Sequence, residues 1–304
     1  MSYTTAKASE ARFRALTGMK EETFNDLLPY FSDAHDEYFR YHKLNGKPRS
    51  GLRRAVIYRN SPLPSMEERL YFILYFIKNN VIQELLGDHF GMDQPTCCQW
   101  LHCLYGILQK ALKNASVMPA STRKELEAVY EKMNSEEIAV LLQDGSEREI
   151  PRPSDPDVQE DKYSGKKKRH TVKNAVITTL AGIILFVSQT VSGKTHDKKI
   201  ADEMCFFPTT SWVFQDTGYQ GYRASDHTFM PIKKPKNREL FKHEKTYNRL
   251  ISSVRVRVEN HIGSAKILHT VRYECRLRKN DFTGSVFHVA AAIHNFRLGV
   301  KVPL

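Results

Sequence analysis

The sequence lacks a long uninterrupted run of apolar residues. Its longest apolar stretch, from Ala175 to Val187, is broken by threonines and a glycine. It is too short for a transmembrane helix, which needs about 20 residues. The first residues lead into charged sequence and not into the apolar core of a secretion signal. We therefore expect no membrane partner and a cytoplasmic location.

Cysteines are few and show no pairing pattern. The chain has 5 of them, an odd number without paired CxxC spacing, which argues against a disulfide framework. Cys97, Cys98, His102 and Cys103 do cluster in the sequence. They allow two interpretations, a zinc site or small apolar side chains on a buried helix, and we favour the second. Reduced thiols agree with a cytosolic protein.

Acidic residues are outnumbered by basic ones. The chain has 34 Asp and Glu against 46 Lys and Arg, which gives a net charge of +12 at pH 7. This balance favours nucleic acid or another anionic surface as the partner. The length of 304 residues suggests about two domains, each large enough to bury a core.

The first 115 residues have a helical pattern. Apolar residues recur at helical spacing in 21–30 and 65–78, and residues 38–64 between them, rich in Arg, Lys, Gly and Pro, predict a loop or linker. Residues 116–137 predict a connecting helix, with Thr122 and Glu125 as its capping box. We expect a helical DNA-binding region over 1–115.

Residues 81–110 have the pattern of a helix-turn-helix. A short apolar helix is followed by Gly91, and Asp93 and Pro95 are suited to the cap and first turn of a second helix. The polar residues near the start of a recognition helix contact base edges. They would be Gln94, Thr96 and Gln99. The alternative is a plain helical hairpin in a bundle.

From residue 138 the pattern changes to strands and helices. Residues 138–142 are continuously apolar, as in a strand covered on both faces. Residues 170–180 and 183–191 predict a hairpin around Ala181-Gly182. We further expect helices over 192–204, 239–266 and 281–298 and strands over 211–215 and 229–232. This order predicts an α/β fold, a ribonuclease H-like mixed-sheet domain over 138–304.

Two of the predicted strands end on an aspartate. Asp144 follows the apolar strand and precedes Gly145, which predicts a tight turn directly after the carboxylate. Asp216 follows the strand over 211–215 and opens a loop with two glycines and two tyrosines. In open sheets of this kind, active residues lie at the carboxyl ends of strands. An Asp-Gly turn without a function is the alternative for Asp144.

A glutamate on the long basic helix completes a set of three carboxylates. Arg255, Glu259 and Lys266 lie within about 60° of arc on one helix face at about 100° per residue. The adjacent apolar stripe would pack on the sheet; it consists of Val254, Val258, Ile262 and Ala265. A solvated ion-pair face is the alternative. Three carboxylates from separate elements in a basic protein are the ligands that two divalent ions require in a phosphodiester-cleaving enzyme.

Taken together, these residues resemble the insertion-sequence transposases of the insertion-sequence-five group, in the DDE superfamily related to Harbinger-type elements. The third family motif is Tyr-x2-Arg-x3-Glu-x6-Lys. Arg255, Glu259 and Lys266 match it, and Ser252 stands at the tyrosine position. The other segments that resemble the family are 143–145, 163–173, 195–198, 216–221 and 231–235. The resemblance extends from about residue 65 to the end of the chain.

The resemblance implies a function and a set of roles. Asp144, Asp216 and Glu259 would be the catalytic residues and would bind two Mg²⁺ ions, for which Mn²⁺ substitutes. Arg255 and Lys266 would bind phosphate or the flanking strand. The activity would be cleavage at the ends of an insertion sequence and transfer of the 3′-hydroxyl strands to target DNA. The expected partner is double-stranded DNA, with a dimer or higher oligomer at synapsis, in the bacterial nucleoid. His196 and Asp197 would lie near the site without an assigned role.

Two basic runs add candidate DNA contacts. Lys166, Lys167, Lys168 and Arg169 form the first, and Lys233 and Lys234 begin the second. Side chains of this kind contact phosphates and give salt-dependent affinity without sequence preference. A solvated surface is the alternative.

Two other functions share part of this pattern. A sequence-specific DNA-binding protein that does not cleave, either a regulator or an inactive relic, would keep the helix-turn-helix. A nuclease without strand transfer would keep the three carboxylates. The intact carboxylates favour the transposase, and Ser252 in place of the family tyrosine is the one departure.

Overall fold

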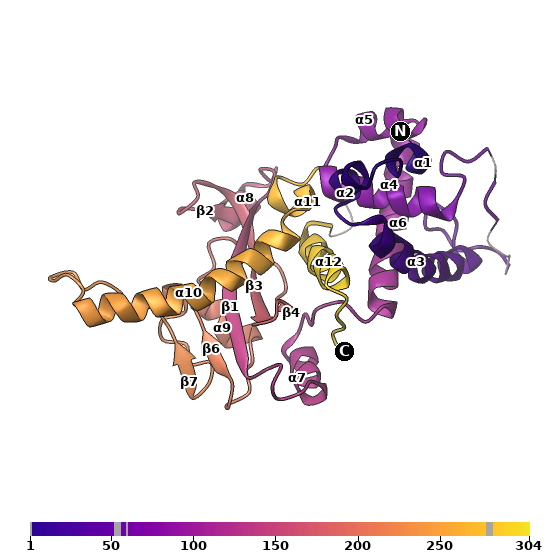
Figure 1. The fold of residues 1–304 in the computed structure, drawn as a ribbon. Helices are drawn as coiled ribbons and strands as arrows, with labels where there is room; N and C mark the ends of the chain where they lie inside the picture. The colour runs from indigo at the N-terminus through magenta and orange to yellow at the C-terminus, as the bar shows by residue number, and fades with distance from the viewer. Residues whose placement is uncertain (1, 52–55, 59, 278–281) are drawn as a thin grey trace. The chain divides into compact units, whose positions relative to one another are not determined.

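The computed structural model describes residues 2–51, 56–58, 60–277 and 282–304. It consists of two compact units, neither continuous in sequence. The first contains residues 1–117 and 267–289, and the second contains 118–266 and 290–304. The ribbon is drawn in Figure 1. None of the helices in the described residues is both long and apolar enough to cross a membrane.

The first unit is helical. Its helices are α1 (Tyr3–Ala6), α2 (Glu10–Thr17), α3 (Glu21–Tyr41), α4 (Met66–Asn79), α5 (Gln83–Phe90), α6 (Gln94–Asn114), α11 (His269–Arg272) and the first part of α12 (Phe282–Arg297). Buried aromatic rings form much of its core. Phe13 and Phe24 pack edge to face with centroids 5.3 Å apart, and Tyr71 stacks on Phe13 at 6.3 Å.

The two helices expected before residue 80 are confirmed, with one correction between them. Helix α3 continues to Tyr41, so the first residues of the predicted loop over 38–64 are helical. The apolar spacing continues to Phe39, which is buried, and this extends the helix past Tyr30. Residues 52–55 and 59 of that segment lie outside the described residues. So does Asp281 of the last predicted helix, which is described from Phe282.

Helices α5 and α6 form a pair joined by a short turn. Gly91 ends α5 with a φ of 68°, and Asp93 caps α6 by accepting a hydrogen bond from the Thr96 backbone N–H. Gly87 allows the turn to approach closely, since a Cβ there would lie 2.5 Å from the Met92 carbonyl oxygen. The predicted cap and turn residues are therefore placed as expected.

The second unit contains a mixed seven-stranded sheet with the order β2-β3-β1-β6-β7, and β4 and β5 also pair with β3. Its strands are β1 (Val140–Glu149), β2 (Tyr163–Ser164), β3 (Arg169–Thr179), β4 (Ile184–Val187), β5 (Val191–Ser192), β6 (Trp212–Phe214) and β7 (His227–Phe229). Strand β1 is antiparallel to β3 and parallel to β6. The expected α/β fold with a helical N-terminal region and a mixed sheet is confirmed.

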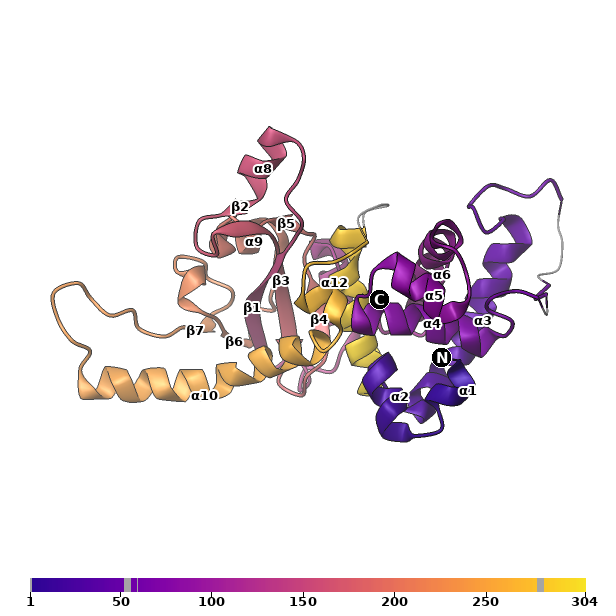
Figure 2. The ribbon, with the colours of Figure 1, turned by 90° about the horizontal axis from the view of Figure 1, so that it is seen from above.

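Helices cover the sheet of the second unit. They are α7 (Arg123–Lys132), α8 (Pro156–Lys162), α9 (Asp197–Met204), the 3₁₀ turn η1 (Thr217–Tyr219), α10 (Lys242–Ala265) and the end of α12. Leu141 and Val213 pack in one core with residues of α7 and α9. Helix α10 lies along the sheet, and its N-terminal half extends beyond it, as Figure 2 shows from above.

Alternation along the strands assigns α10 to the opposite face from this core. Successive strand residues point to opposite faces, so Leu142 and Asp144 point away from the side of Leu141. Thr178, the pairing partner of Leu142, bonds through its hydroxyl to His261 of α10 at 3.0 Å. Asp144 therefore lies on the face that α10 covers.

Several predicted boundaries need correction. The strand expected over 138–142 begins at Val140 and continues to Glu149, so Asp144 is followed by more strand and not by a tight turn. The reason is its antiparallel pairing with β3, which continues to Glu149 opposite Thr171. The connecting helix is the shorter α7, with the predicted capping box of Thr122 and Glu125. The hairpin of β3 and β4 is confirmed.

Candidate functional site

Asp144 of β1 and Asp216, which follows β6 and caps η1, lie at equivalent positions relative to the pairing of these two strands. The parallel pairing of β1 and β6 places Leu142 opposite Phe214. Asp144 follows Leu142 by two residues, and Asp216 follows Phe214 by two residues. The preceding glutamines are hydrogen-bonded to each other, Gln215 Nε2 to Gln143 Oε1 at 2.6 Å. Gln143 in turn donates to Cys205 Sγ at 3.2 Å. This buried polar contact holds the two aspartates side by side.

Helix α10 brings Arg255 and Glu259 to the same place. Arg255 Nη1 lies 3.4 Å from Asp216 Oδ1, and the Arg255 side chain is 11% exposed. Glu259, one turn further along, is exposed to solvent. Of the predicted apolar stripe, Val258, Ile262 and Ala265 are buried. Burial of that stripe fixes the rotation of α10 and so the direction of Arg255 and Glu259.

The charge state of Asp144 reflects this arrangement. Burial raises its pKa from 3.8 to about 6, while the Gly145 N–H and the Arg255 guanidinium lower it and the negative charges of Asp216 and Glu259 raise it. All three predicted carboxylates are therefore close enough to interact. A carboxylate whose ionisation is opposed by burial and by two like charges is a typical feature of a functional site.

Lys266 lies near Asp144, and Lys167 of the first basic run lies near Lys266. Lys266 caps the C-terminal end of α10. The pKa of Lys266 is lowered, mainly by burial and then by the positive charge of Arg148, with a smaller contribution from Lys167. The negative charge of Asp144 acts in the opposite direction and raises it. Lys166, Lys167 and Lys168 occupy the exposed turn between β2 and β3, and Arg169 begins β3 with an ion pair to Glu149 at 2.7 Å. Of these cations, Lys266 therefore adds positive charge near Asp144, and Lys167 adds it near Lys266.

The other predicted DNA contacts are spread over both units. Lys233 and Lys234 are exposed in the segment before α10, where Lys234 pairs with Glu239. On α6, Gln94 donates to Gln83 of α5 and is half-buried. Thr96 bonds to Asp93, and Gln99 is exposed. Of the predicted recognition residues, Gln99 has the greatest exposure.

The clustered cysteines lie on α6. Cys97 and Cys103 are buried in the core of the first unit, and all five cysteines are free thiols. Burial raises the pKa of Cys97 and of Cys103 to about 12. At neutral pH both thiols are therefore protonated, and they pack as small apolar side chains in the core.

The three carboxylates have the chemistry of hard-cation ligands. Mg²⁺ and Mn²⁺ prefer carboxylate oxygens. Asp144 and Asp216 each use Oδ1 to accept a hydrogen bond from the next backbone N–H, at 2.8 Å and 2.7 Å. Within the described parts of the chain, no three acidic, histidine or cysteine side chains are gathered into a preformed metal site. The mutual repulsion at Asp144 nevertheless fits a site that receives cations, and the buried Arg255 Nε, which has no hydrogen-bond partner among the described residues, fits one that receives phosphate.

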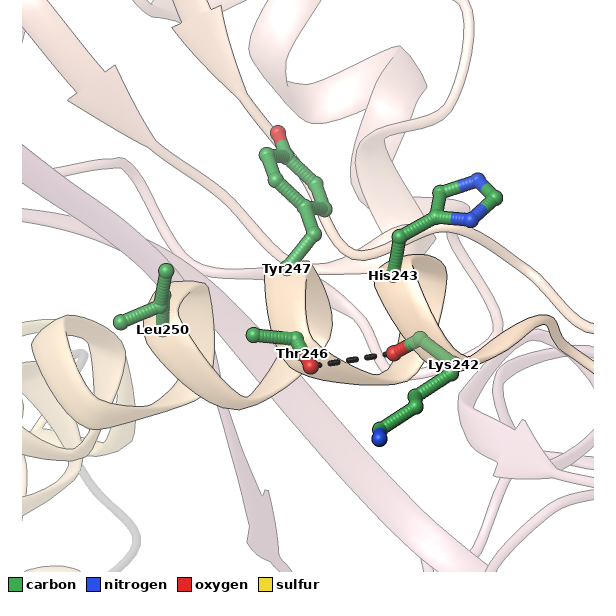
Figure 3. A pocket seen from close by; sticks show the side chains of 5 residues that line it. All are labelled: Lys242, His243, Thr246, Tyr247 and Leu250. Atoms are coloured by element: carbon green, nitrogen blue, oxygen red, sulfur yellow. Dashed lines mark hydrogen bonds between the residues drawn. The ribbon is translucent and has the colours of Figure 1, made fainter.

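A shallow pocket lies on α10 away from the carboxylates. It is lined by Lys242, His243, Thr246, Tyr247 and Leu250 (Figure 3). Leu250 precedes Glu259 by nine residues, about 14 Å along a helix. The pocket lacks the carboxylate set, so we assign the candidate site to Asp144, Asp216 and Glu259 and not to this pocket.

Three residues close to the aspartates had no function assigned to them from the sequence. Asp197, at the start of α9, forms an ion pair with Lys173 of β3 at 3.0 Å. A Cβ at Gly145 would lie 3.2 Å from Asp197 Oδ1 and 3.8 Å from the Tyr219 hydroxyl. The sequence signal for Asp197 was its place in the segment 195–198. Lys173 and Tyr219 gave no signal beyond lying in segments that resemble the family.

Comparison with known proteins agrees with this geometry. Residues 143–295 match the family described as DDE superfamily endonuclease, and this segment contains all three carboxylates. The chain is 27% identical over 299 residues to the probable transposase for insertion sequence element IS702 of Microchaete diplosiphon, and the match covers 97% of this chain and 98% of the relative. No solved structure matches. The match across half of its length, from Gln143 at the first aspartate to Asn295, shows that this chain belongs to the DDE superfamily of endonucleases, as its carboxylate motifs predicted.

Proposed function

We propose that the protein is a DNA transposase that cleaves phosphodiester bonds at the ends of an insertion sequence and joins the 3′-hydroxyl strands to target DNA. The observation that carries the proposal is the register of β1 and β6. It sets Asp144 beside Asp216 on the face of the sheet that α10 covers and to which α10 brings Glu259. The likeness to a probable insertion-sequence transposase over nearly the full chain supports it.

Asp144, Asp216 and Glu259 are the residues that would hold two Mg²⁺ ions. When bound, such ions generate a nucleophile at neutral pH and stabilise charge on the leaving oxygen of an in-line displacement. The two aspartates come from the sheet and its following turn and Glu259 comes from the helix, so the three carboxylates would supply ligands from different elements. Glu259 is exposed and the Asp216 side chain is 47% exposed, which leaves the site open to a duplex.

The cations around the carboxylates would bind the DNA backbone. Arg255 touches Asp216 from α10 and offers its remaining donors to the phosphate beside the cleaved bond. Lys266 and the turn with Lys166, Lys167 and Lys168 would contact phosphates further along. Charge-assisted hydrogen bonds of this kind orient the phosphate and add salt-dependent affinity. Because the attacking groups are water and then the freed 3′-hydroxyl, no covalent bond forms between protein and DNA.

The helices α5 and α6 would provide recognition of the element end. In this arrangement α6 lies in the major groove, with Gln99 and the start of the helix, Gln94 and Thr96, toward base edges. Bringing two element ends together would require at least two copies of the chain. Each copy would contribute one set of carboxylates.

Strand transfer distinguishes a transposase from a simple nuclease. The test supplies a precut duplex that carries the flanking DNA of the gene with a free 3′-hydroxyl, together with a supercoiled target plasmid and Mg²⁺. We expect joined products with wild type and none with Glu259→Gln. Hydrolysis of the duplex without joining would reduce the proposal to a nuclease.

A further inference from the structure

A single carboxylate lies against both glycines that follow the paired aspartates. Gly145 comes directly after Asp144, and Gly218 comes two residues after Asp216. A Cβ at Gly145 would be 3.2 Å from Asp197 Oδ1, and a Cβ at Gly218 would be 2.7 Å from Asp197 Oδ2. The Asp197 carboxylate thus occupies the space that a side chain at either position would need. The backbones behind both aspartates meet at this one group.

Asp197 is itself fixed to the sheet. Lys173 Nζ lies 3.0 Å from Asp197 Oδ1, with side chains 13% and 30% exposed. Lys173 Nζ also donates to the Thr195 carbonyl oxygen at 3.1 Å. Lys173 belongs to β3, opposite Glu147 of β1. The ion pair therefore connects the start of α9 to the strand next to that of Asp144.

The carboxylate lies behind the candidate site. By strand alternation, Gly145 faces the same side as Leu141, opposite to Asp144. Tyr219 is in the core on that side, and its buried hydroxyl has no hydrogen-bond partner among the described residues. Burial first, Cys205 second, and then the charges of Asp197, Asp144 and Asp216 raise the Tyr219 pKa. Asp197 is thus close to both aspartates but on the face turned away from Glu259.

We propose that Asp197, held by Lys173, is a positioning residue that sets the spacing of Asp144 and Asp216 by supporting Gly145 and Gly218 from the opposite face of the sheet. The inference rests on the proposed function, because spacing matters only if the two aspartates share ions. Groups that orient metal ligands without touching the metal change metal affinity or activity about 10–100-fold when they are replaced.

The test measures Mn²⁺ binding by isothermal titration calorimetry with DNA-free, full-length protein, beside the thermal midpoint without metal. Asp197→Ala should raise the Mn²⁺ Kd about 10–100-fold. Asp197→Asn should raise it less, because the amide fills the same space and still accepts a hydrogen bond from Lys173. Glu203→Ala is the matched control on the same helix, since Glu203 is 53% exposed and forms its own ion pair with Lys199.

Two outcomes would overturn the proposal. An Mn²⁺ Kd for Asp197→Ala within about twofold of wild type would make Asp197 a purely structural residue, whatever happens to its thermal midpoint. Equal losses for Asp197→Ala and Asp197→Asn, as large as that for Asp144→Asn, would make Asp197 a direct ligand. If Asp197→Ala does not fold, Gly218→Ala displaces the same carboxylate from the other side. An unchanged Mn²⁺ Kd for Gly218→Ala would then also overturn the positioning role.

The same Mn²⁺ titration distinguishes an error in the proposed metal site from an error in the positioning role. If Asp144→Asn and Glu259→Gln also leave Mn²⁺ binding unchanged, the proposed metal site is wrong. If they abolish binding while Asp197→Ala does not change it, the site stands and only the positioning role is wrong.

Discussion

Replacing Asp144 by asparagine should stabilise the metal-free protein. In the folded chain, burial raises the pKa of this carboxyl from 3.8 to about 6, so ionisation is harder there than in the unfolded chain. The folded state gains from this group below about pH 4, loses that gain between pH 4 and pH 6, and has lost it above pH 6. An asparagine side chain does not ionise in this range, so the variant avoids the loss.

The magnitude follows from the pKa difference. The rise of the Asp144 pKa from 3.8 to about 6 corresponds to about 3 kcal/mol. This is an upper limit, because Asp144 is half-buried and solvent screens part of the effect. In a domain of this size, about 1 kcal/mol changes the thermal midpoint by about 2–4 °C. We expect Asp144→Asn to melt up to about 10 °C above wild type at pH 7.5.

Differential scanning calorimetry in EDTA at pH 4, 5, 6 and 7.5 measures this gain. The difference between Asp144→Asn and wild type should be close to zero at pH 4 and constant above pH 6. Adding Mn²⁺ at pH 7.5 should raise the midpoint of wild type more than that of the variant, since a ligand stabilises only the state that binds it. Asp202→Asn is the control, because Asp202 is 45% exposed on the surface of α9. A variant less stable than wild type at pH 7.5 would refute the assignment of a strained carboxylate.

Other substitutions test the surface, the turn and the sheet. Neutralising 166–169 should weaken binding to all DNA and reduce the salt slope by about 0.9 for each phosphate that the variant no longer neutralises; an unchanged slope in fluorescence anisotropy would remove this turn from the interface. Gln99→Ala should lower affinity for the element end by about 1–3 kcal/mol and leave binding to unrelated duplex unchanged in footprinting; equal losses on both would contradict base contact. Thr122→Ala should lower the free energy of unfolding by about 1 kcal/mol, because it removes the capping box of α7; an unaltered urea midpoint would argue against the cap. Gly193→Ala should destabilise by about 1–3 kcal/mol, because its Cβ would lie 1.8 Å from Thr171 Oγ1; a wild-type midpoint would show that the loop yields freely.

The sequence signals behind the three carboxylate predictions are local. Asp216 ends a short apolar strand, and Glu259 lies beside an apolar stripe at helical spacing. Such patterns can be recognised from the few residues on either side of the carboxylate. For Asp144 the sequence predicted the strand before it but also a tight turn directly after it, because Gly145 and the polar residues that follow do not have the composition of a strand. The pairing with β3 that extends β1 is a contact between distant segments, and no local pattern contains it.

The contacts of Asp197 could not be predicted for the same reason, although the sequence placed it near the site. Asp197 contacts Gly145 and Gly218, which are far from it in the chain, and its ion pair with Lys173 joins a helix to a strand. The discontinuous units are a similar case. Residues 267–289 pack with the first unit, for example through the Thr270 hydroxyl, which donates to the Ile77 carbonyl oxygen at 3.0 Å. Chain order alone had placed this segment in the region over 138–304.

Strand cleavage of a duplex that carries the gene's own flanking DNA tests the central claim most directly. Wild type and Glu259→Gln would be compared in Mg²⁺, Mn²⁺ and EDTA, with folding of both checked by circular dichroism. The account predicts cuts at the element ends in Mg²⁺ and Mn²⁺, none in EDTA and none with Glu259→Gln. Well-folded wild type that binds the duplex and cuts it in neither metal would contradict the account and identify a DNA-binding protein without nuclease activity.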